Sequence, residues 1–344
     1  MPEKTVSAPA PPGRARRLRL PSLAYRAAAT PLWLRAAGGA AALLVGLAVA
    51  KGLHDAAQTT VNGIVTGTYF ALGAVGLALV FGVLRLVNFA HGDLLTFAAY
   101  VALLFSATLH FPIVLAMAAG TAATAALAAT SELVLWRPMR RKGAGGFQLL
   151  LITIGLAFVI RNAVQFFAGS TPRTLNVDVT TALNLFGHIR IGRTQLAVVG
   201  VGLFTLVLVG LLLRSTRIGK EMRALADNTS LAEVSGIDTQ RVILVTWALA
   251  GGLAGLAGVV AAAAIGVMTP NFGWVLLLSL FASAVLGGLK SAYGALVGGL
   301  LLGLVEEWST MFVDSRWKFA IGFGVLILAL LARPTGLLGR PEVS

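Results

Sequence analysis

Polar side chains that interrupt the long apolar runs of this sequence are the residues with the clearest capacity for chemistry. They carry amide, hydroxyl and imidazole groups, which can bind a polar solute through hydrogen bonds. Burying such groups in lipid is expensive, so polar residues inside apolar runs mark functional candidates. The candidates for a solute path are Asn62, Thr66, Tyr69, Asn88, His91 and Asn162.

Two further polar residues follow the same logic. Arg161 and Gln165 are four positions apart, so they share one face of a helix. Arg161 could line a path, or it could extend its charged end toward the membrane surface. His91 likewise has a plain alternative, a packed and hydrogen-bonded core histidine. Asn88 or Asp93 could cap the helix that follows them.

A second group of polar residues lies in the segment 214–240, between two apolar runs. Ser230 and Glu233 have the spacing of a capping box, and Gly236 suits a position after a helix. The pattern predicts two short amphipathic helices outside the bilayer, with a corner of small residues that a partner could grip. A plain solvated loop is the alternative.

The composition excludes several classes of protein. Of 344 residues, 57% are hydrophobic and only 12% are charged, and the chain contains no cysteine. A soluble domain could not hide so much apolar surface from water. Without cysteine there are no disulfides or thiolate metal sites. No G-x-x-x-x-G-K-[ST] motif is present, so a phosphate-binding loop of this kind is excluded.

Continuous apolar runs predict an all-α, polytopic membrane protein, since a spanning helix needs about 20 apolar residues. A β-barrel would show alternating rather than continuous runs. The expected spans number about ten: 36–53, 59–82, 94–110, 112–135, 147–168, 194–213, 241–267, 272–289, 291–311 and 317–332.

The residues behind the net charge of +14 divide unevenly between the two sides of the membrane once the spans are placed. With both termini in the cytoplasm, 20 Lys and Arg residues lie inside and six outside, as the positive-inside rule requires. This removes the need for a nucleic-acid partner. Residues 1–35 are expected to form a basic disordered arm, 36–333 the membrane domain and 334–344 a cytoplasmic tail. A cleaved signal peptide ending near Ala50 is the alternative for the first span.

An internal repeat is indicated by one short pattern. Asn88-Phe89 and Asn271-Phe272 each precede a helix, and the expected topology puts them at opposite membrane faces. Inverted repeats of transporters place matching segments in this way. A chance match of two residues is the alternative.

Several short motifs in order give the chain a resemblance to a known family. The sequence resembles the LivH-like permease subunits of ABC importers for branched-chain amino acids, and the resemblance covers about residues 58–340. The motifs that carry it are Asn62-Gly63, NFAHG at 88–92, Arg137-Pro138, TIG at 153–155, the RA…GI loop at 223–237, VLGG at 285–288 and RPTGLLGR at 333–340.

The resemblance implies a division of labour between chains. Family members lie in the plasma membrane. They work with a second, LivM-like permease, two cytoplasmic ATPase subunits and an extracytoplasmic substrate-binding protein. This chain would then bind no cofactor, and ATP would be used by the partner ATPases. The expected ATPase-coupling residues are Arg217, Arg223, Asp227, Glu233, Gly236 and Ile237.

Other transport functions and an enzyme are the alternatives to this function. Relatives of such permeases also carry urea, short amides or other amino acids. A secondary transporter or channel would favour acidic residues buried in spans for ion coupling. Glu132 is the acidic residue that we expect inside a span, where it can simply pair with Arg137. A membrane enzyme would need a cluster of Asp, His or Glu on one face. No two His lie within a helical turn of each other, and the close pairs His91-Asp93 and His54-Asp55 are expected in loops.

Overall fold

The computed structural model describes residues 46, 52–175, 177, 181–185, 189–332 and 335–338. The chain divides into two units, Met1–Leu43 and Leu44–Ser344, and only the second contains described residues. The predicted basic arm at 1–35 and most of the predicted first span at 36–53 therefore lie outside the described residues.

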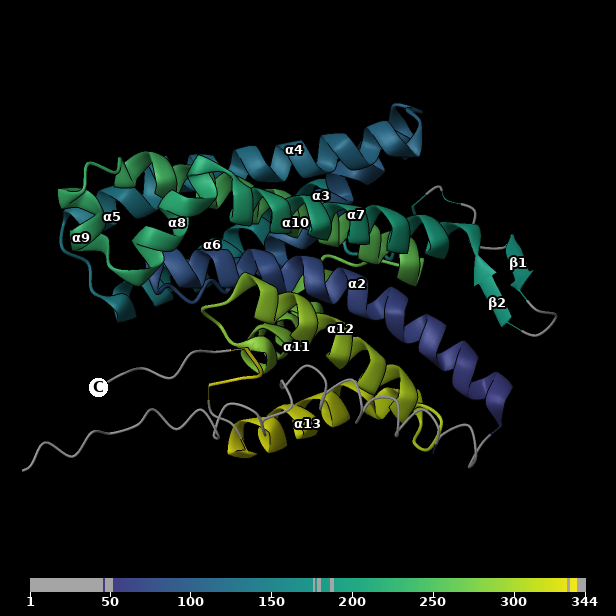
Figure 1. Ribbon diagram of the computed structural model, residues 1–344. Helices are drawn as coiled ribbons and strands as arrows, with labels where there is room; N and C mark the ends of the chain where they lie inside the picture. The colour runs from purple at the N-terminus through teal and green to yellow at the C-terminus, as the bar shows by residue number, and fades with distance from the viewer. Residues whose placement is uncertain are drawn as a thin grey trace, which may run out of the picture. The chain divides into compact units, whose positions relative to one another are not determined.

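The described part of the chain is built almost entirely from helices, so the prediction of an all-α, polytopic membrane protein is confirmed (Figure 1). The longer helices are α2 (Leu53–Leu84), α3 (Ala90–Leu103), α4 (Ile113–Ser131), α6 (Gly146–Ala168), α7 (Arg193–Ser215), α10 (Thr239–Ile265), α11 (Phe272–Gly287), α12 (Ala292–Ser309) and α13 (Lys318–Ala332). The shorter elements are η2 (Leu104–Thr108), η3 (Glu132–Trp136), α5 (Arg137–Arg141), α8 (Arg217–Asp227), α9 (Thr229–Val234) and η4 (Ser315–Trp317), with strands β1 (Ala182–Leu185) and β2 (Ile189–Gly192).

The predicted spans after the first each correspond to a helix within a few residues at either end. Among the described residues, six helical stretches are long and apolar enough to cross a membrane, and α11 is a shorter apolar helix. The six are 53–84, 90–108, 113–141, 146–168, 193–215 and 239–265. The total of ten spans and the cytoplasmic position of both termini stay predictions.

Two helix pairs form the centre of the membrane domain, and glycines set their distance. α2 packs along α12, where Gly67 of α2 faces Gly303 of α12. A Cβ on Gly303 would lie 2.2 Å from the Gly67 nitrogen, so only glycine fits this crossing. α10 packs along α4 in the same way, with Gly251 against Ala128 and the Thr124 carbonyl. Small residues allow such backbone contact, which drives helix association in lipid.

Helices α3 and α11 begin inside the helical unit, away from the ends of α2 and α10, the long helices that precede them. Arg85, directly after α2, donates from Nη2 to the Ala226 carbonyl at 2.9 Å. His91, at the start of α3, instead contacts the Gly73 carbonyl at 2.9 Å. Gly73 precedes the end of α2 by eleven residues, or about 16 Å of helix. The segment 86–89 therefore turns back into the helical unit before α3 begins.

The segment between α10 and α11 repeats this arrangement. Arg85, directly after α2, has φ +54°, and Gly266, directly after α10, has φ +82°, both left-handed. The helix contacts also correspond. α2 packs on α12 as α10 packs on α4, and α3 packs on α6 as α11 packs on α13. These matched contacts among the described helices support the internal repeat that Asn88-Phe89 and Asn271-Phe272 suggested. Its inverted orientation in the membrane stays a prediction.

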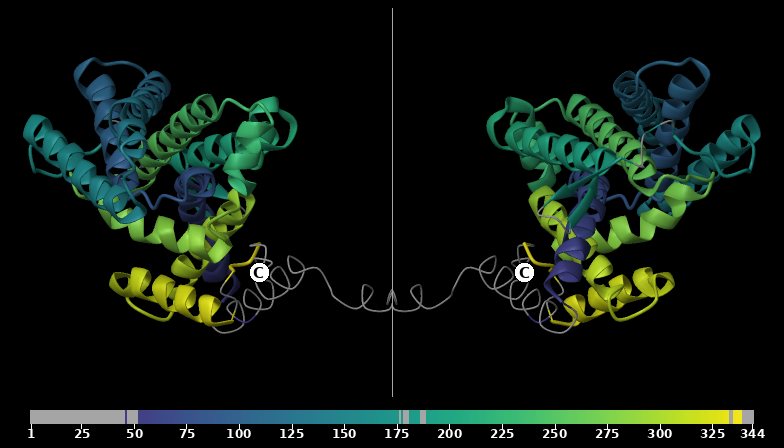
Figure 2. Two further views of the ribbon diagram at one scale, coloured as in Figure 1. Left: turned by 90° about the vertical axis from the view of Figure 1, so that its left-hand side faces the viewer. Right: turned by 90° about the vertical axis from the view of Figure 1, so that its right-hand side faces the viewer.

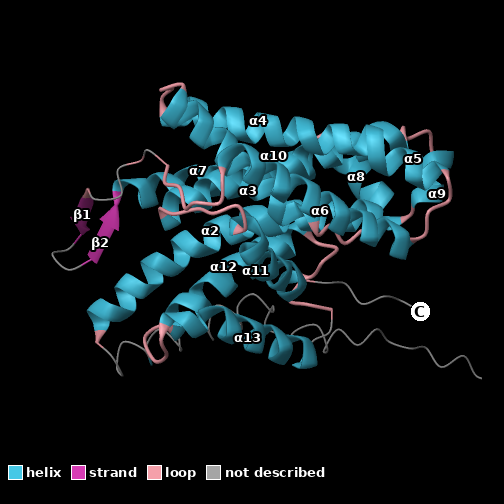
Figure 3. Cartoon of the chain, turned by 180° about the vertical axis from the view of Figure 1, so that it is seen from behind, coloured by secondary structure: helices cyan, strands magenta, loops and turns pink. Residues whose placement is uncertain are grey.

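The two ends of the helices carry different elements. α5, α8 and α9 gather at one end, and the β1–β2 hairpin lies at the opposite end (Figures 1 and 3). The hairpin pairs Ala182 with Gly192 through Leu185 with Ile189. It was not predicted, since its strands are only four residues long. The Gln58 side chain anchors it to α2, accepting from the Arg190 nitrogen at 2.8 Å and donating to its oxygen at 2.9 Å.

The end of the described chain returns to the Gly-Gly turn after α11. Leu337 donates its backbone N–H to the Leu286 carbonyl at 2.8 Å, and Leu338 donates to that of Gly287 at 3.0 Å. These bonds satisfy carbonyls that a helix C-terminus leaves without partners. Gly336, at φ +75°, packs directly against the Gly288 backbone. The 285–288 motif and residues 335–338 of the last motif are thus joined in one structural feature.

Candidate functional site

The starts of α3 and α11 meet inside the helical unit, and this meeting is the best-defined candidate site. Gly92 of α3 lies directly on Gly273 of α11, where a Cβ on Gly273 would fall 1.8 Å from the Gly92 oxygen. The Gly273 N–H donates to Thr96 Oγ1 at 2.9 Å. Two helix N-termini therefore overlap at one point. Discontinuous helices that meet in this way form the solute sites of many transporters.

One buried ion pair joins this crossing to a third helix. Arg161 of α6 donates from Nε and Nη2 to the two carboxylate oxygens of Asp93, at 2.9 and 3.0 Å. The Asp93 side chain is fully buried, and that of Arg161 is 13% exposed. The guanidinium carbon also lies 4.6 Å from the ring centroid of Trp274, at the start of α11. Arg161 therefore pairs inside the protein and does not extend to the membrane surface.

Asp93 lies in the first turn of α3. The free N–H groups and the dipole at a helix N-terminus favour an anion there, and the bidentate guanidinium neutralises it. Without such a partner a buried carboxylate would be very costly. The arrangement fixes α3, α6 and α11 relative to one another through one charge pair.

Asn88 and His91 lie in the same region but serve the backbone. The Asn88 side chain accepts a hydrogen bond from the Ala90 N–H at 3.1 Å, as an asparagine before a helix can. His91 donates from Nε2 to Gly73, which leaves Nδ1 buried without a hydrogen-bond partner. Both residues are about 1% exposed. Their path roles stay predictions, and the contacts found here are those of packed residues.

The other path candidates lie away from the crossing of α3 and α11. Thr66 and Tyr69 are buried on α2, and Thr66 donates to Glu307 of α12 at 2.8 Å. Asn62 accepts from Gln58 one turn earlier on α2. Asn162 is exposed on α6, and its amide bonds the Phe158 carbonyl of its own helix at 2.8 Å. The six candidates therefore do not form one site.

Two acidic residues inside a span were missed in the sequence. Glu306 and Glu307 lie in α12, within the predicted span 291–311. Glu307 pairs with Lys318 of α13, and Glu306 accepts from Ser279 of α11 at 3.2 Å. Adjacent carboxylates in an apolar run were a visible signal. Glu132 was identified, but its partner is Arg140 and not Arg137, because α5 brings Arg140 back over it.

The coupling candidates lie on α8 and α9, the two short helices predicted for the loop, and, for Gly236 and Ile237, directly after α9. Thr216 caps α8 and Asn228 caps α9, accepting from Leu231 at 3.0 Å, so the expected cap at Ser230 was wrong. Gly236 follows α9 at φ +81°, and the Ile237 N–H bonds the Ala232 carbonyl at 3.1 Å, which closes the helix. The prediction of two helices is confirmed.

The coupling candidates differ in exposure. Arg217 is 94% exposed and pairs with Glu221 at 2.8 Å, and Asp227 is exposed at the end of α8. Arg223 donates to the Leu213 carbonyl, and Glu233 accepts from Thr239 at 3.2 Å. These two side chains tie α8 to α7 and α9 to α10.

The outer face of α9 carries apolar side chains. Leu231 and Val234 are 64% and 87% exposed, whereas Ala232 is buried. The corner of small residues that we expected to be gripped therefore faces inward in part. The large apolar side chains that α9 exposes are Leu231 and Val234. Spacing alone did not distinguish these faces, because α9 is only six residues long.

Within the part of the chain that the structure describes, no three His, Asp or Glu side chains come together in a way that could hold a metal ion. The polar groups found at the crossing and on α12 are bound to one another or to the backbone. They can orient a solute and carry motion between helices. They do not form a nucleophile–base pair or a paired acid and base around an open site.

Comparison with known proteins points to one family of membrane permeases. A family model described as "Branched-chain amino acid transport system / permease component" matches residues 59–330. The chain is 33% identical to the high-affinity branched-chain amino acid transport system permease protein BraD of Pseudomonas aeruginosa, over 83% of this chain and 97% of that protein.

Two further relatives support the assignment. The permease protein LivH of Escherichia coli K12 is 33% identical over 83% of this chain and 96% of its own length. The probable branched-chain amino acid transport permease protein LivH of Methanocaldococcus jannaschii is 28% identical over 80% and 90%. No solved structure matches the chain. The chain therefore belongs to the family of permease components of branched-chain amino acid transport systems.

Proposed function

We propose that this chain is the membrane permease subunit of an ABC importer in the plasma membrane, and that it moves branched-chain amino acids inward. ATP is hydrolysed by two cytoplasmic ATPase subunits. A second, LivM-like permease completes the path, and an extracytoplasmic binding protein delivers the solute. The family membership and the absence of a phosphate-binding loop motif support this division between chains.

The observation that carries the proposal is the construction of α8 and α9. Met222 and Leu225 anchor α8 by their buried side chains, while Leu231 and Val234 of α9 project from the same segment. An exposed apolar surface on a firmly held element is typical of a protein contact. Movement of a docked ATPase would pass through α8 to α7 and α10.

Alternating access would act on the crossing of α3 and α11. The ion pair between Asp93 and Arg161 links the two helix starts to α6, so a shift of one repeat against the other changes this junction. Interfaces of this kind switch between discrete packings rather than deform continuously. The path candidates Asn62, Thr66, Tyr69, Asn88, His91 and Asn162 are proposals in this scheme.

A glycine substitution tests the coupling surface. Gly236→Leu forces a side chain onto φ +81°, which should distort the α9 corner. In proteoliposomes containing the complete complex, we expect ATP hydrolysis to persist while uptake falls by about tenfold or more, a loss of about 1.4 kcal/mol in coupling.

Gly143→Leu is the matched control. Gly143 has φ +76° at the same end of the helices, also with no neighbouring atom within 4 Å, but it lies between α5 and α6. It should reduce uptake little. Equal uptake in Gly236→Leu and the native complex would exclude α9 as the coupling surface.

The solute class requires a direct measurement. Uptake of labelled leucine, isoleucine and valine should exceed that of urea, acetamide and polar amino acids with the same binding protein. If urea or a short amide is transported preferentially, the alternative within the same family is correct. Uptake by the purified chain alone, driven by an ion gradient, would instead support a secondary transporter.

A further inference from the structure

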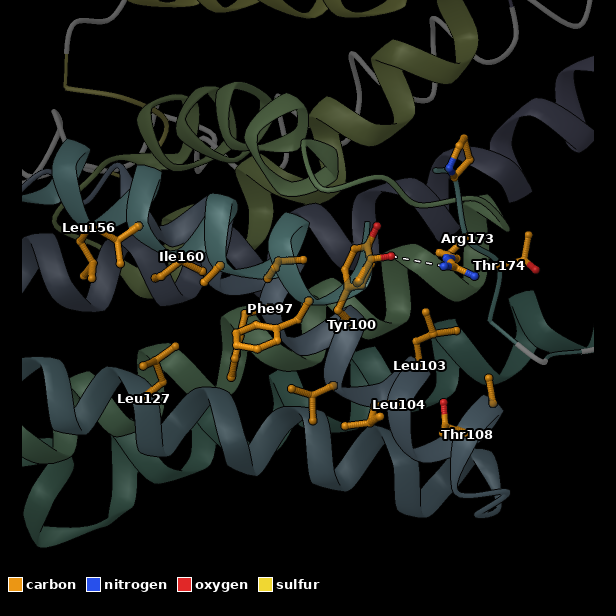
Figure 4. A pocket seen from close by; sticks show the side chains of 18 residues that line it. Phe97, Tyr100, Leu103, Leu104, Thr108, Leu127, Leu156, Ile160, Arg173 and Thr174 are labelled. Atoms are coloured by element: carbon orange, nitrogen blue, oxygen red, sulfur yellow. Dashed lines mark hydrogen bonds between the residues drawn. The ribbon is translucent and has the colours of Figure 1, made fainter. Parts of the chain in front are cut away.

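A cavity of about 890 Å³ opens in the side of the helical unit between α4 and α6. Both helices pack on α3, but they are not packed against each other, so α3 forms the floor of the fork. The floor includes Phe97 and Val101, and the walls include Leu127, Leu156 and Ile160 (Figure 4). The cavity therefore lies within the membrane-spanning part of the chain.

The polar groups of the cavity gather at one end. Tyr100, Arg173, Thr174 and Thr108 lie near the hairpin end, with Leu103 and Leu104 beside them, while the rest of the length is lined by Phe97, Leu127, Leu156 and Ile160 (Figure 4). Tyr100 is 7% exposed, and its hydroxyl has no hydrogen-bond partner. A buried hydroxyl without a partner is costly. It indicates a polar group of an occupant at this end.

Arg173 presents a positive charge beside that hydroxyl from a fixed backbone. Its main chain exchanges two hydrogen bonds of 2.9 Å with Met268, in the segment before α11. The guanidinium donates from Nη2 to the Ala168 carbonyl at 3.3 Å, a long contact, and the residue is exposed. Its other N–H groups are in position to bind an anion, as guanidinium groups bind phosphate.

The residues that line the cavity distinguish between two classes of occupant, an amino acid and a lipid with a negatively charged head. An amino acid is a zwitterion and needs a partner for its ammonium group. None of the described residues that line the cavity is acidic. The walls beyond the polar end are apolar for their whole length, and the mouth is bordered by exposed Val159 and Phe167. This chemistry fits a long hydrocarbon chain with a negatively charged head.

We propose that the fork between α4 and α6 binds an anionic phospholipid of the bilayer. One acyl chain fills the cavity over α3, and the phosphate lies between Arg173 and the Tyr100 hydroxyl. The lipid holds α4 and α6 apart. The π-helical turn η2 lines the cavity with Leu104, Ala107 and Thr108. Such turns occur often at functional positions because they redirect side chains.

The absence of native cysteine allows a direct test. Val101→Cys on the cavity floor is labelled with bimane in the full chain, and the chain is placed in vesicles of phosphatidylethanolamine with phosphatidylglycerol. Phosphatidylglycerol with brominated acyl chains should quench the label more strongly than equally brominated phosphatidylethanolamine. Leu196→Cys on α7, 51% exposed, reports ordinary lipid contact and should show no headgroup preference.

Two variants test the polar end. In the Val101→Cys background, Arg173→Gln should lower the preference for phosphatidylglycerol by about threefold to tenfold, as expected for one charge-assisted hydrogen bond. Tyr100→Phe should lower it by a smaller factor, since the ring and the packing remain. Arg190→Gln removes an exposed positive charge at the same end, outside the cavity, and should leave the preference unchanged.

Three results would overturn the proposal. The first is equal quenching by both brominated lipids at Val101→Cys, or a preference that Arg173→Gln and Tyr100→Phe leave unchanged. The second is protection of Val101→Cys from bimane by leucine, which would make the cavity part of the solute path. The third is loss of lipid quenching when the second permease is present, which would assign the fork to a subunit interface.

Discussion

The two repeats of the membrane domain share a packing scheme but differ in the groups that hold their last helices. In the first repeat, α6 is held to α3 by the pair of Asp93 and Arg161, whose carboxylate is fully buried. In the second, α13 is held to α12 by Lys318 and Glu307, whose side chains are 20% and 14% exposed. α13 lies at the periphery in the end-on views of Figure 2.

The starts of the two interrupted helices also differ. Asn88 and Asp93 supply buried polar groups at the start of α3, whereas α11 begins with an exposed Asn271 and an aromatic Trp274. Trp274 stacks on Arg161 of the first repeat. The repeated scaffold therefore brings the helix starts together, and unequal side chains give the junction its chemistry. Changes at matched positions should then have unequal effects.

The largest effect is expected at the buried ion pair. Asp93→Leu leaves the Arg161 guanidinium without its anion, and removing one partner of a buried pair costs about 3–5 kcal/mol. Thermal unfolding of the purified chain in detergent should show this as a large loss of stability. The double variant Asp93→Leu, Arg161→Met removes both charges and should recover most of it.

The double variant also separates stability from transport. We expect a folded protein whose uptake is low in the assembled importer, because the charge link between the repeats is gone. A double variant no more stable than Asp93→Leu would mean that the side chains act by shape. Full uptake in that variant would mean that the pair is only structural.

The next effect is expected where the helix starts touch. Gly273→Ala places a methyl group 1.8 Å from the Gly92 oxygen, so α3 and α11 must separate. Overpacking of this kind costs about 1–3 kcal/mol, and we expect the upper end because a backbone atom blocks the way. Gly155→Ala on α6 meets no atom within 4 Å and should be neutral in the same unfolding measurement. Equal stability of the two variants would argue against the tight crossing.

The counterpart in the second repeat should be weaker. Lys318→Met removes the cation that pairs with Glu307, while Thr66 still donates to that carboxylate. Because both side chains are partly exposed, we expect a loss of about 2 kcal/mol, between the values for surface and buried pairs. Adding Glu307→Gln should restore part of it. A loss as large as that of Asp93→Leu would remove the difference between the repeats.

The sequence predicted the helices well and the contacts poorly. Apolar runs located the spans from 59–82 onward, because length and hydropathy are local properties. The pairing of Asp93 with Arg161 joins residues 68 positions apart, and no local pattern encodes it. The two matching Asn-Phe pairs indicated the repeat. The sequence did not predict that segment 86–89 turns back and starts α3 inside the helical unit. The contact between His91 and the Gly73 carbonyl shows this.

The smallest effect is expected at the two asparagines that precede the interrupted helices. Asn88→Ala removes the acceptor for the buried Ala90 N–H and should cost about 1 kcal/mol, as loss of a helix-start hydrogen bond usually does. Asn271 is exposed and makes no side-chain cap bond to α11, so Asn271→Ala should change the unfolding free energy by less than about 0.5 kcal/mol.

Uptake per folded molecule then decides what Asn88 does beyond this bond. If Asn88 only supports α3, the Asn88→Ala importer should transport nearly as well as the native one at a temperature where both are folded. If Asn88 lines the solute path, uptake should fall by more than the folded fraction explains, and Asn271→Ala should not share the loss. Equal losses at both positions would mean that the helix starts contribute alike, which would contradict the asymmetry between the repeats.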